Sequence, residues 1–526
     1  MQAQQSSGPK GCMRMQNRKD GNPNMKKLLA LTLALAMCMT MIVVTASAEE
    51  VTKPEKISIF IDGTVVTQEN GQAQFEARWE ELTGIDLEIT QPDHDAYFDV
   101  LQQMIASGDW PDVLILPSTY YSAYASEGVL WDMTDAWEAG DTKNSGRFNG
   151  DSVIEGLKFD SRLYGFSPTR GNGCLTYVKQ TWLDAVGMEA PTNYEEYTAM
   201  LDAFVTMDPD GNGANDTYGV SAAGFIGPEH PYVNYLPEFY QDAYPSFMKL
   251  EDGTWVDGFT LESMKGAMER LNEGYTKGWI DPTTLTNGTR DCREKFYDDG
   301  FGVFTYWAGT WGTNLKTNLE NNGLSGELVA LEPIAEVDAY FDRVPPVWAI
   351  TTACENPEGV FKYFIDTMLD GGDMQMLWTY GVEGVHWSKS AGIVYEGTEN
   401  AVTYEDGQFH MLENLETPGT SYTKNHVDPM LSLASFAEGY YDPREDSVKP
   451  EAKLSSEVFN ANSKLALIVP STEEMSMYNG DLTTLKNELI ALVTMGELTY
   501  DEAMARFENE GGKTWSEAIV ASLNAL

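Results

Sequence analysis

A short acidic loop carries the residue types and spacing that most clearly specify chemistry. Side-chain oxygens, or in one case a backbone carbonyl, recur at alternate positions: Asp208, Asp210, Asn212, Ala214 and Asp216. Gly213 stands at the sixth position, where a calcium loop of EF-hand type turns sharply. The spacing predicts a structural Ca²⁺ site, although the twelfth position is Gly219 and not the usual glutamate. A surface turn without a cation is the alternative, because such turns also favour Asp, Asn and Gly.

Aromatic residues form a second group of candidates, and several of them follow predicted strands. The candidate ligand contacts of this kind are Tyr120, Tyr121, Trp307, Trp311, Trp348, Tyr380 and Trp387. Flat rings with a polar edge stack on the apolar faces of sugars. Loops beyond the carboxyl ends of strands are where α/β proteins bind ligands. The set therefore predicts a sugar-binding cleft, although core packing is the alternative for any single ring.

Three polar residues complete the candidate binding site. Arg170 lies in a polar turn, where it could clamp a ligand carboxylate or a pair of hydroxyls, or could simply be a surface arginine. Glu383 and His386 lie within the aromatic segment that ends at Trp387. His386 could bind a ligand by a hydrogen bond, and an ordinary core histidine is the alternative.

The motifs of the common catalytic centres are missing from the sequence. It contains no H-E-x-x-H, no G-x-S-x-G, no Walker A loop and no G-x-G-x-x-G after a strand. The acidic residues number 81, so a pair at the spacing of a glycosidase has no diagnostic value. No catalytic residue is predicted.

Composition narrows the class of protein further. The chain has 526 residues, of which 42% are hydrophobic, so it is long enough for two or three domains with real cores. The 34 basic residues against 81 acidic ones give a net charge of −47, which argues against binding to nucleic acid or anionic lipid. We expect a monomer that binds no nucleic acid.

The N-terminal segment predicts export. Met25-Lys26-Lys27 is a basic start, residues 28–44 are apolar, and Ala46-Ser47-Ala48 fits a cleavage site. Residues 1–48 are therefore interpreted as a leader and signal peptide. Cys38 lies in a sequence with the outline of a lipoprotein signal, but Met37 is bulky where a small residue is expected. Cleavage after Ala48 is the favoured interpretation, with a lipid anchor or an uncleaved membrane anchor as alternatives.

Periodicity predicts an α/β fold. Apolar runs predict strands at 57–62, 85–89, 112–116, 302–306 and 348–352. Residues at helical spacing predict helices over 75–82 and 97–105 that end at Gly84 and Gly108, a helix that starts at Pro357, and a helical C-terminus from Leu482. Strands that alternate with helices indicate sheets with crossover helices. Without a long linker, two lobes would be joined by several short crossings.

An ordered series of segments resembles the family 1 extracellular solute-binding proteins of ABC importers. Residues 96–116 (AYFDVLQQMIASGDWPDVLIL) are similar to the "iASGdxPDvi" stretch of that family. Further stretches match in the same order: 124–134, 175–216, 273–282, 347–356 and 380–387. The resemblance implies a periplasmic-binding-protein type II fold, in which two lobes close over an interlobe cleft by a hinge motion. Of the aromatic candidates, Trp307 and Trp311 correspond best to an aromatic platform of the family.

The resemblance also implies how the chain is divided. It would cross between lobes near 165, return near 335 and cross again near 370. The N-terminal lobe would hold 49–165 and 335–370, and the C-terminal lobe 166–334 and 371–526.

The function implied is that of a secreted or cell-surface receptor. It would capture an oligosaccharide, perform no chemistry and deliver the sugar to the transmembrane subunits of an ABC permease. A secreted carbohydrate-active enzyme and a binding protein for peptides or another non-sugar ligand are the alternatives.

Overall fold

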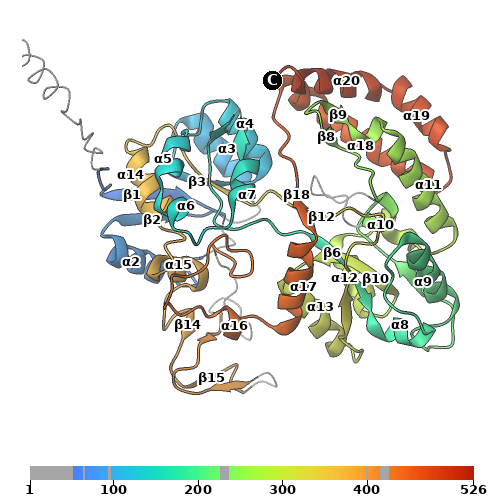
Figure 1. Cartoon of the computed structure of the whole chain (residues 1–526), viewed down its shortest axis with the longest axis horizontal. Coiled ribbons are helices and arrows are strands. Elements are labelled where there is room, and N and C mark those ends of the chain that lie inside the picture. The colour runs from blue at the N-terminus through green and yellow to red at the C-terminus, as the bar shows by residue number, and fades with distance from the viewer. Residues whose placement is uncertain are drawn as a thin grey trace, which may run out of the picture. The chain divides into compact units, whose positions relative to one another are not determined.

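Two four-stranded sheets organise the protein, each with its own hydrophobic core (Figure 1). The computed structural model describes residues 51–62, 66–92, 96–159, 161–225, 236–397, 401–414 and 426–526. The predicted signal peptide and Cys38 therefore lie outside the described residues. The chain divides into two compact units between Val51 and Thr52, and everything below concerns the unit from Thr52 onward.

The first sheet has the strand order β13-β3-β1-β2. Its strands are β1 (Lys56–Phe60), β2 (Asp86–Thr90), β3 (Val113–Leu116) and β13 (Val347–Ile350). The first three run parallel and β13 runs antiparallel to β3, with Val347 opposite Leu116. Parallel neighbours need crossover helices, which are α2 (Gln72–Thr83) and α3 (Tyr97–Ser107). These elements confirm the predicted strand–helix alternation.

Glycines end both crossover helices as predicted. Gly84 and Gly108 follow α2 and α3 with φ of 64° and 78°, the left-handed conformation that glycine adopts without a Cβ clash. Further elements of the first core are α4 (Ser118–Ser126), α5 (Thr134–Ala139), α6 (Asp141–Asn144), α7 (Asp151–Gly156), β4 (Lys158–Phe159), β5 (Arg162–Leu163), α14 (Pro357–Val360), the π-helix Phe361–Ile365 and α15 (Asp373–Tyr380). Small hairpins extend from it: β14 (Trp387–Ser388) with β17 (His410–Met411), and β15 (Gly392–Val394) with β16 (Val402–Tyr404).

The second sheet has the order β11-β6-β10-β7. Its strands are β6 (Cys174–Lys179), β7 (Tyr218–Val220), β10 (Phe301–Trp307) and β11 (Leu328–Ala330). β6 is buried along its whole length because β11 and β10 pair with its two edges. Helices and hairpins cover this sheet: α8 (Gln180–Val186), α9 (Tyr194–Thr206), α10 (Pro237–Tyr240), β8 (Phe247–Lys249), β9 (Trp255–Asp257), α11 (Glu262–Thr276), α12 (Thr289–Tyr297), α13 (Thr310–Asn321) and α17 (Pro450–Ala461).

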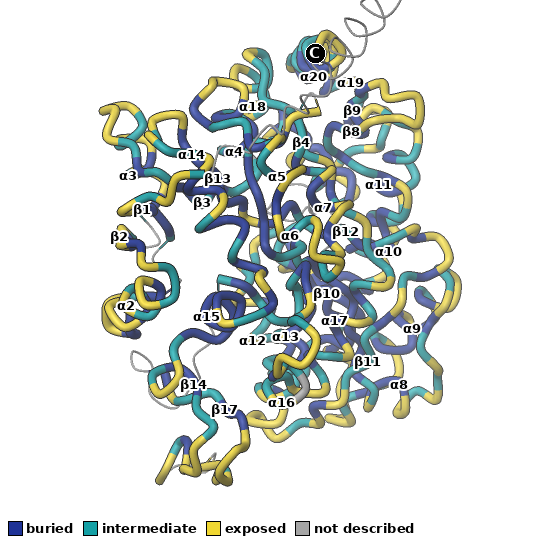
Figure 2. The backbone as a smooth tube through the Cα atoms, turned by 60° about the vertical axis from the view of Figure 1, so that its left-hand side comes forward, coloured by how far each residue is buried: buried dark blue, intermediate teal, exposed yellow. Residues whose placement is uncertain are grey.

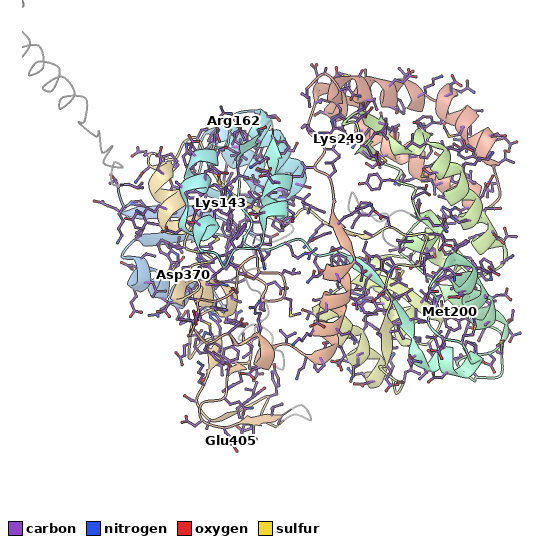
Figure 3. The ribbon with its side chains drawn as sticks, viewed as in Figure 1. Lys143, Arg162, Met200, Lys249, Asp370 and Glu405 are labelled. Atoms are coloured by element: carbon purple, nitrogen blue, oxygen red, sulfur yellow. The ribbon has the colours of Figure 1, made fainter. Side chains whose placement is uncertain are left out.

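The burial pattern follows the two cores (Figure 2). Met200 on α9 is fully buried in the second core, whereas Lys249 and Glu405 lie exposed at hairpin ends (Figure 3). The hydrophobic core of the first sheet is one cluster, and the strands of the second sheet pack into two clusters, so each sheet can be stabilised by burial of its own apolar surface.

The cores correct the predicted division of the chain. Met374, Trp378 and Leu433 pack in the first core, although residues 371–434 were assigned to the C-terminal lobe. The third crossing therefore lies between Ala434 and the helix α17, and not near residue 370. The second crossing lies between Val337, which packs in the second core, and Val344, which packs in the first.

Three connecting segments meet between the two sheets. β12 (Tyr340–Asp342) pairs in parallel with β18 (Ser463–Leu465), and the turn that contains Arg170 lies against both. A Cβ atom on Gly171 would lie 1.7 Å from the carbonyl oxygen of Arg343. A residue without a side chain is therefore required there, because the backbones approach so closely.

The C-terminal helices complete the second core. They are α18 (Glu473–Thr494), α19 (Tyr500–Asn509) and α20 (Gly512–Leu523), as the sequence predicted. The buried Lys486 Nζ on α18 donates to Asp257 Oδ1 at 2.7 Å, and Ser516 on α20 donates to Asp257 Oδ2 at 2.7 Å. The Asp257 carboxylate on β9 thus connects helices α18 and α20 by hydrogen bonds. Among the described residues, no helix is both long enough and apolar enough to span a membrane.

We predict that Asp257→Ala lowers the free energy of unfolding by about 3–5 kcal/mol, because it leaves the Lys486 ammonium buried without its counter-charge. Urea denaturation measures this change. The control is Glu294→Ala, which breaks the exposed pair with Arg290 and should change stability by less than about 0.5 kcal/mol. Equal effects of the two substitutions would contradict the prediction.

Candidate functional site

A cavity of about 430 Å³ lies where the first sheet meets the connecting segments. Its walls come from the ends of β1 and β3, the start of α3, and segments 167–172, 343–348 and 426–431. The carboxyl ends of parallel strands commonly border ligand sites, because the chain leaves the sheet there. The lining includes two cations, Arg170 and Arg343, and two carboxylates, Asp62 and Asp428.

Aromatic side chains form one wall of the cavity. Tyr97 and Phe98 line it, and the Phe98 ring stacks on Tyr120 with centroids 4.9 Å apart and planes 7° apart. The Tyr120 hydroxyl accepts a hydrogen bond of 2.7 Å from Gln102 Nε2. Phe98 retains 37% of its surface exposed, so part of this aromatic side chain remains open beside the cavity. The predicted contact Tyr120 thus supports this wall from behind Phe98.

His426 also lines the cavity and packs against two tryptophans of the first core. Its ring packs edge-on against Trp378 at 4.7 Å and tilts over Trp348 at 5.7 Å. Neither ring nitrogen has a hydrogen-bond partner among the described residues. Burial lowers the pKa of His426 to about 3, so the imidazole is neutral at physiological pH. Trp348 itself is 1% exposed, which fits a core residue whose edge reaches the cavity.

The Arg170 side chain forms hydrogen bonds within the protein. Its Nε donates to Asp342 Oδ2 at 2.7 Å and its Nη2 donates to Ser463 Oγ at 2.9 Å. Burial raises the pKa of Asp342, and the nearby Arg170 opposes that rise. The guanidinium lines the cavity, but these bonds tie the three connecting segments together.

The two tryptophans favoured from the family resemblance lie beside cations. The guanidinium of Arg343 lies 4.9 Å from the Trp307 ring centroid, and Arg343 lines the cavity. Trp307 at the end of β10 therefore connects the second sheet to the cavity through a cation–π contact. Trp311 on α13 instead packs against Arg293 and Tyr306 and is not among the cavity-lining residues.

Three further candidates are buried in the protein interior. Tyr121 is fully buried and its hydroxyl donates to the Leu157 carbonyl at 2.7 Å. Tyr380 is 1% exposed and packs edge-on against Phe409. His386 accepts from Val382 N at 2.9 Å through Nδ1, and its Nε2 lies 2.8 Å from the Asn70 carbonyl oxygen. This geometry fits the alternative of an ordinary core histidine.

Glu383 and Trp387 line a different hollow, of about 590 Å³, that shares no lining residue with the cavity. The predicted aromatic residues are therefore not gathered at one site, because some line the cavity or the second hollow and others are buried or belong to the second sheet. The sequence could not separate them, because proximity along the chain does not show which surface a turn faces.

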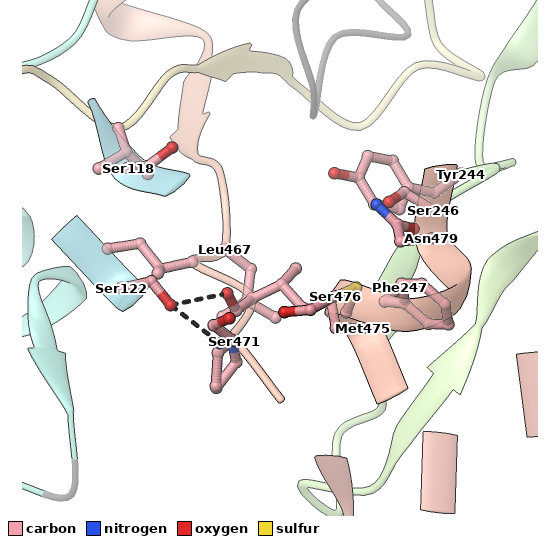
Figure 4. A pocket seen from close by; sticks show the side chains of 14 residues that line it. Ser118, Ser122, Tyr244, Ser246, Phe247, Leu467, Ser471, Met475, Ser476 and Asn479 are labelled. Atoms are coloured by element: carbon pink, nitrogen blue, oxygen red, sulfur yellow. Dashed lines mark hydrogen bonds between the residues drawn. The ribbon is translucent and has the colours of Figure 1, made fainter. Parts of the chain in front are cut away.

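A third cavity, of about 250 Å³, lies beside the connecting segment 467–471 (Figure 4). Ser118 and Ser122 of α4 line one side, and Tyr244, Ser246 and Asn479 line the other (Figure 4). Ser122 Oγ accepts a hydrogen bond from Ser471 N at 2.9 Å, which fixes the segment to α4. Of the described residues that line this cavity, none is acidic, basic or a histidine.

The acidic loop adopts the turn that its spacing predicted. Gly211 and Gly213 have φ of 69° and 85°, the left-handed region that favours glycine. Asn212 Nδ2 donates to Asp210 Oδ2 at 2.7 Å and to Asp216 Oδ1 at 3.0 Å, so the carboxylates converge. Among the described residues, no group of three or more His, Cys, Asp or Glu side chains has the geometry of a metal site. The calcium site remains a prediction.

His426, Asp428, Phe98 and Asp62 are cavity residues that the sequence analysis did not identify. Asp62 could have been found from its place at the end of a predicted strand, and Phe98 from its place at the start of a predicted helix. His426 had no such signal, because its neighbours are distant in sequence and include Phe75 and Trp348.

Comparison with known proteins shows which proteins the chain is similar to. Residues 72–289 match the family described as bacterial extracellular solute-binding protein, and this match confirms the predicted resemblance. The polygalacturonan/rhamnogalacturonan-binding protein YtcQ of Bacillus subtilis (strain 168) is 22% identical over 467 residues, covering 82% of this chain and 84% of YtcQ. Lipoprotein LipO of the same organism is 24% identical over 481 residues, covering 85% of this chain and 87% of LipO.

A solved structure supports the fold. An HMO-binding ABC-transporter-associated solute-binding protein from Bifidobacterium longum infantis superposes with a TM-score of 0.63 at 14% identity. The match covers 90% of this chain and 98% of that protein. The predicted two-lobed α/β fold is confirmed.

We predict that His426 makes stability depend on pH. The unfolded imidazole titrates near pH 6.5, so between that value and about pH 3 the unfolded chain binds a proton that the folded chain excludes. Stability should therefore fall as the pH falls through this window, by about 1.4 kcal/mol per pH unit. Urea unfolding of the wild type and of His426→Phe at several pH values tests this. The difference in the free energy of unfolding between the wild type and His426→Phe should change with pH. A difference that stays constant would contradict the prediction.

Proposed function

Because the chain is similar to bacterial extracellular solute-binding proteins, we propose that it captures a neutral oligosaccharide and delivers it to an ABC permease. The observation that carries this proposal is the cavity between the first sheet and the connecting segments, with an exposed ring beside charged groups of both signs. Sugars need this combination, because their rings have apolar faces and their hydroxyls both donate and accept hydrogen bonds.

The position of the cavity suits a protein that closes on its ligand. One wall belongs to the first core, and Arg343 connects another wall to Trp307 of the second sheet. A ligand stabilises the closed state only by the contacts that it gains there. A sugar that touches both Phe98 and Arg343 would contact helix α3 of the first core and the connecting segment that reaches Trp307 of the second sheet.

Charge favours a neutral sugar. Residues 49–526 contain 28 basic and 80 acidic side chains, which repel a polyanion at long range. Within the cavity, Arg170 is bonded to Asp342, while Asp62 and Asp428 add negative charge. YtcQ is named for binding polygalacturonan, so an acidic ligand is the clear competing case.

We propose that the bound sugar is released unchanged. A carbohydrate-active enzyme remains the competing case, and recovery of cleaved sugar would establish it. We also propose that the protein acts as a monomer outside the cytoplasmic membrane, either free or held by a lipid as the name of LipO suggests for that relative.

A structural Ca²⁺ in the acidic loop is a further part of the proposal. The donor set of carboxylates and an amide is the type that Ca²⁺ prefers. The side chains of Asp210 and Asp216 already meet at the Asn212 amide, and Asp208 Oδ1 is buried without a hydrogen-bond partner among the described residues. Asp208, Asp210, Asn212 and Asp216 would hold the ion with the Ala214 carbonyl, and the ion would offset the repulsion between the carboxylates.

We predict that the protein binds one or more neutral oligosaccharides from a panel of kestose, maltotetraose, xylotetraose and galactotetraose. Phe98→Ala should weaken that binding about tenfold, because the sugar loses an aromatic face. Isothermal titration calorimetry measures both, and Met207→Ala, which removes an exposed side chain outside the cavity, is the control. Preference for oligogalacturonides over all four sugars would contradict the neutral-ligand proposal.

We predict that EDTA lowers the thermal midpoint and that added Ca²⁺ restores it, since a ligand that binds only the folded state stabilises that state. Asp208→Ala should lose the response to both reagents. Asp252→Ala, at an exposed turn that lies outside the loop, should keep it. A wild-type midpoint that does not respond to EDTA would show that the loop is an ordinary turn.

A further inference from the structure

The second hollow, of about 590 Å³, is built on the first core away from the cavity. Helices α2 and α15, strand β14 and the segment 439–441 supply its walls (Figure 1 shows α2, α15 and β14). Helices α2 and α15 pack against each other, so the hollow rests on regular structure. Met376, Leu377 and Trp387 are buried beneath it.

Two neighbouring tyrosines give the hollow exposed aromatic surface. Tyr440 and Tyr441 are 37% and 39% exposed. Phe436 stacks on one face of Tyr440, with centroids 5.6 Å apart and planes 7° apart, so the exposed surface of Tyr440 is on its other side. The Tyr440 hydroxyl donates to Asp373 Oδ1 at 2.5 Å, which fixes the orientation of the ring. A fixed ring loses little conformational freedom when a ligand stacks on it.

Charged groups surround these rings. Arg78 Nη1 lies 2.6 Å from Glu81 Oε2, and its Nη2 lies 3.7 Å from Asp373 Oδ2. Lys389 Nζ lies 4.0 Å from the Tyr441 ring centroid. With Glu383, the lining has two cations and three carboxylates, all within one concave surface. Such groups donate to and accept from vicinal hydroxyls without favouring a strongly charged ligand.

We propose that this hollow is a second saccharide-binding site, which takes one or two units of a neutral glycan on the exposed face of Tyr440. The site lies outside the cavity, because the two share no lining residue. This inference rests on the proposed function for the class of ligand. It also gives a role to Glu383 and Trp387, which the cavity does not use.

The concave shape favours a small ligand over a protein partner. Protein interfaces are usually flat and exceed about 1,000 Å² of buried surface. Here the exposed rings and charges converge within one hollow of about 590 Å³. A second site would retain the distal part of a long glycan while its end occupies the cavity.

Hydrogen–deuterium exchange with each of the four neutral sugars tests the proposal. Phe98→Ala should weaken sugar binding in the cavity, so this variant reports binding at the second site separately. In it, peptides covering residues 373–389 and 436–446 should still gain protection when sugar is added. Tyr440→Ala should reduce the affinity reported by these peptides at least about tenfold and leave protection around Tyr97 and Phe98 unchanged.

Ile393→Ala, which shortens an exposed side chain on the β15–β16 hairpin outside the hollow, is the matched control and should keep the protection. Thermal midpoints equal to that of the wild type establish that the variants are folded. Protection confined to the cavity would overturn the second site and leave the proposed function intact. Protection at neither place with any of the four sugars would overturn both. Tyr440→Ala that binds like the wild type would also overturn the second site.

Discussion

The ion pair between Arg170 and Asp342 holds together the part of the protein on which the candidate site depends. Its hydrogen bond, together with the bond from Arg170 to Ser463, joins three segments that are far apart in sequence. These segments form one side of the cavity and connect the two cores. Removal of one partner would leave the other charge buried and unpaired, which is the costly way to break such a pair. The arginine therefore acts on the binding site through the backbone that it positions.

Both cores stabilise the protein by burial, and the cavity lies at the margin of the first core. Each sheet buries its own apolar surface, so neither core needs the ligand in order to form. The cavity is built at the margin of the first core, where Phe98 and the connecting segments remain partly exposed. Binding surfaces lie in such places because a fully packed core has no room for a ligand.

The sequence predicted the first sheet well because its signals are local. Alternation in β2, the apolar run of β3 and the glycines after α2 and α3 each lie within a few residues of the element that they specify. The third crossing was placed wrongly, since the apolar residues of 371–434 do not show which of two cores they enter. Periodicity gives the buried face of a segment but not its partner.

The candidate site was harder to predict for the same reason. Arg170 meets Asp342 across 172 positions and His386 meets Asn70 across 316. No pattern within either segment shows these contacts, so both residues were assigned to a ligand that would satisfy their polar groups. The acidic loop was easier to predict, because its turn directly follows helix α9 and its spacing is local. Trp307 ends β10 and reaches the cavity only through Arg343, whereas Trp311 lies on α13 outside the cavity.

The long separation between paired strands has a consequence for biosynthesis. The first sheet is complete only when β13 reaches β3, more than half of the chain after β1, and the second core also needs α20 at the very end. Contacts between distant residues slow folding, because a large loop must close before they form. Neither core can therefore be completed by the N-terminal half of the chain alone, and each closes only when a distant segment has been made.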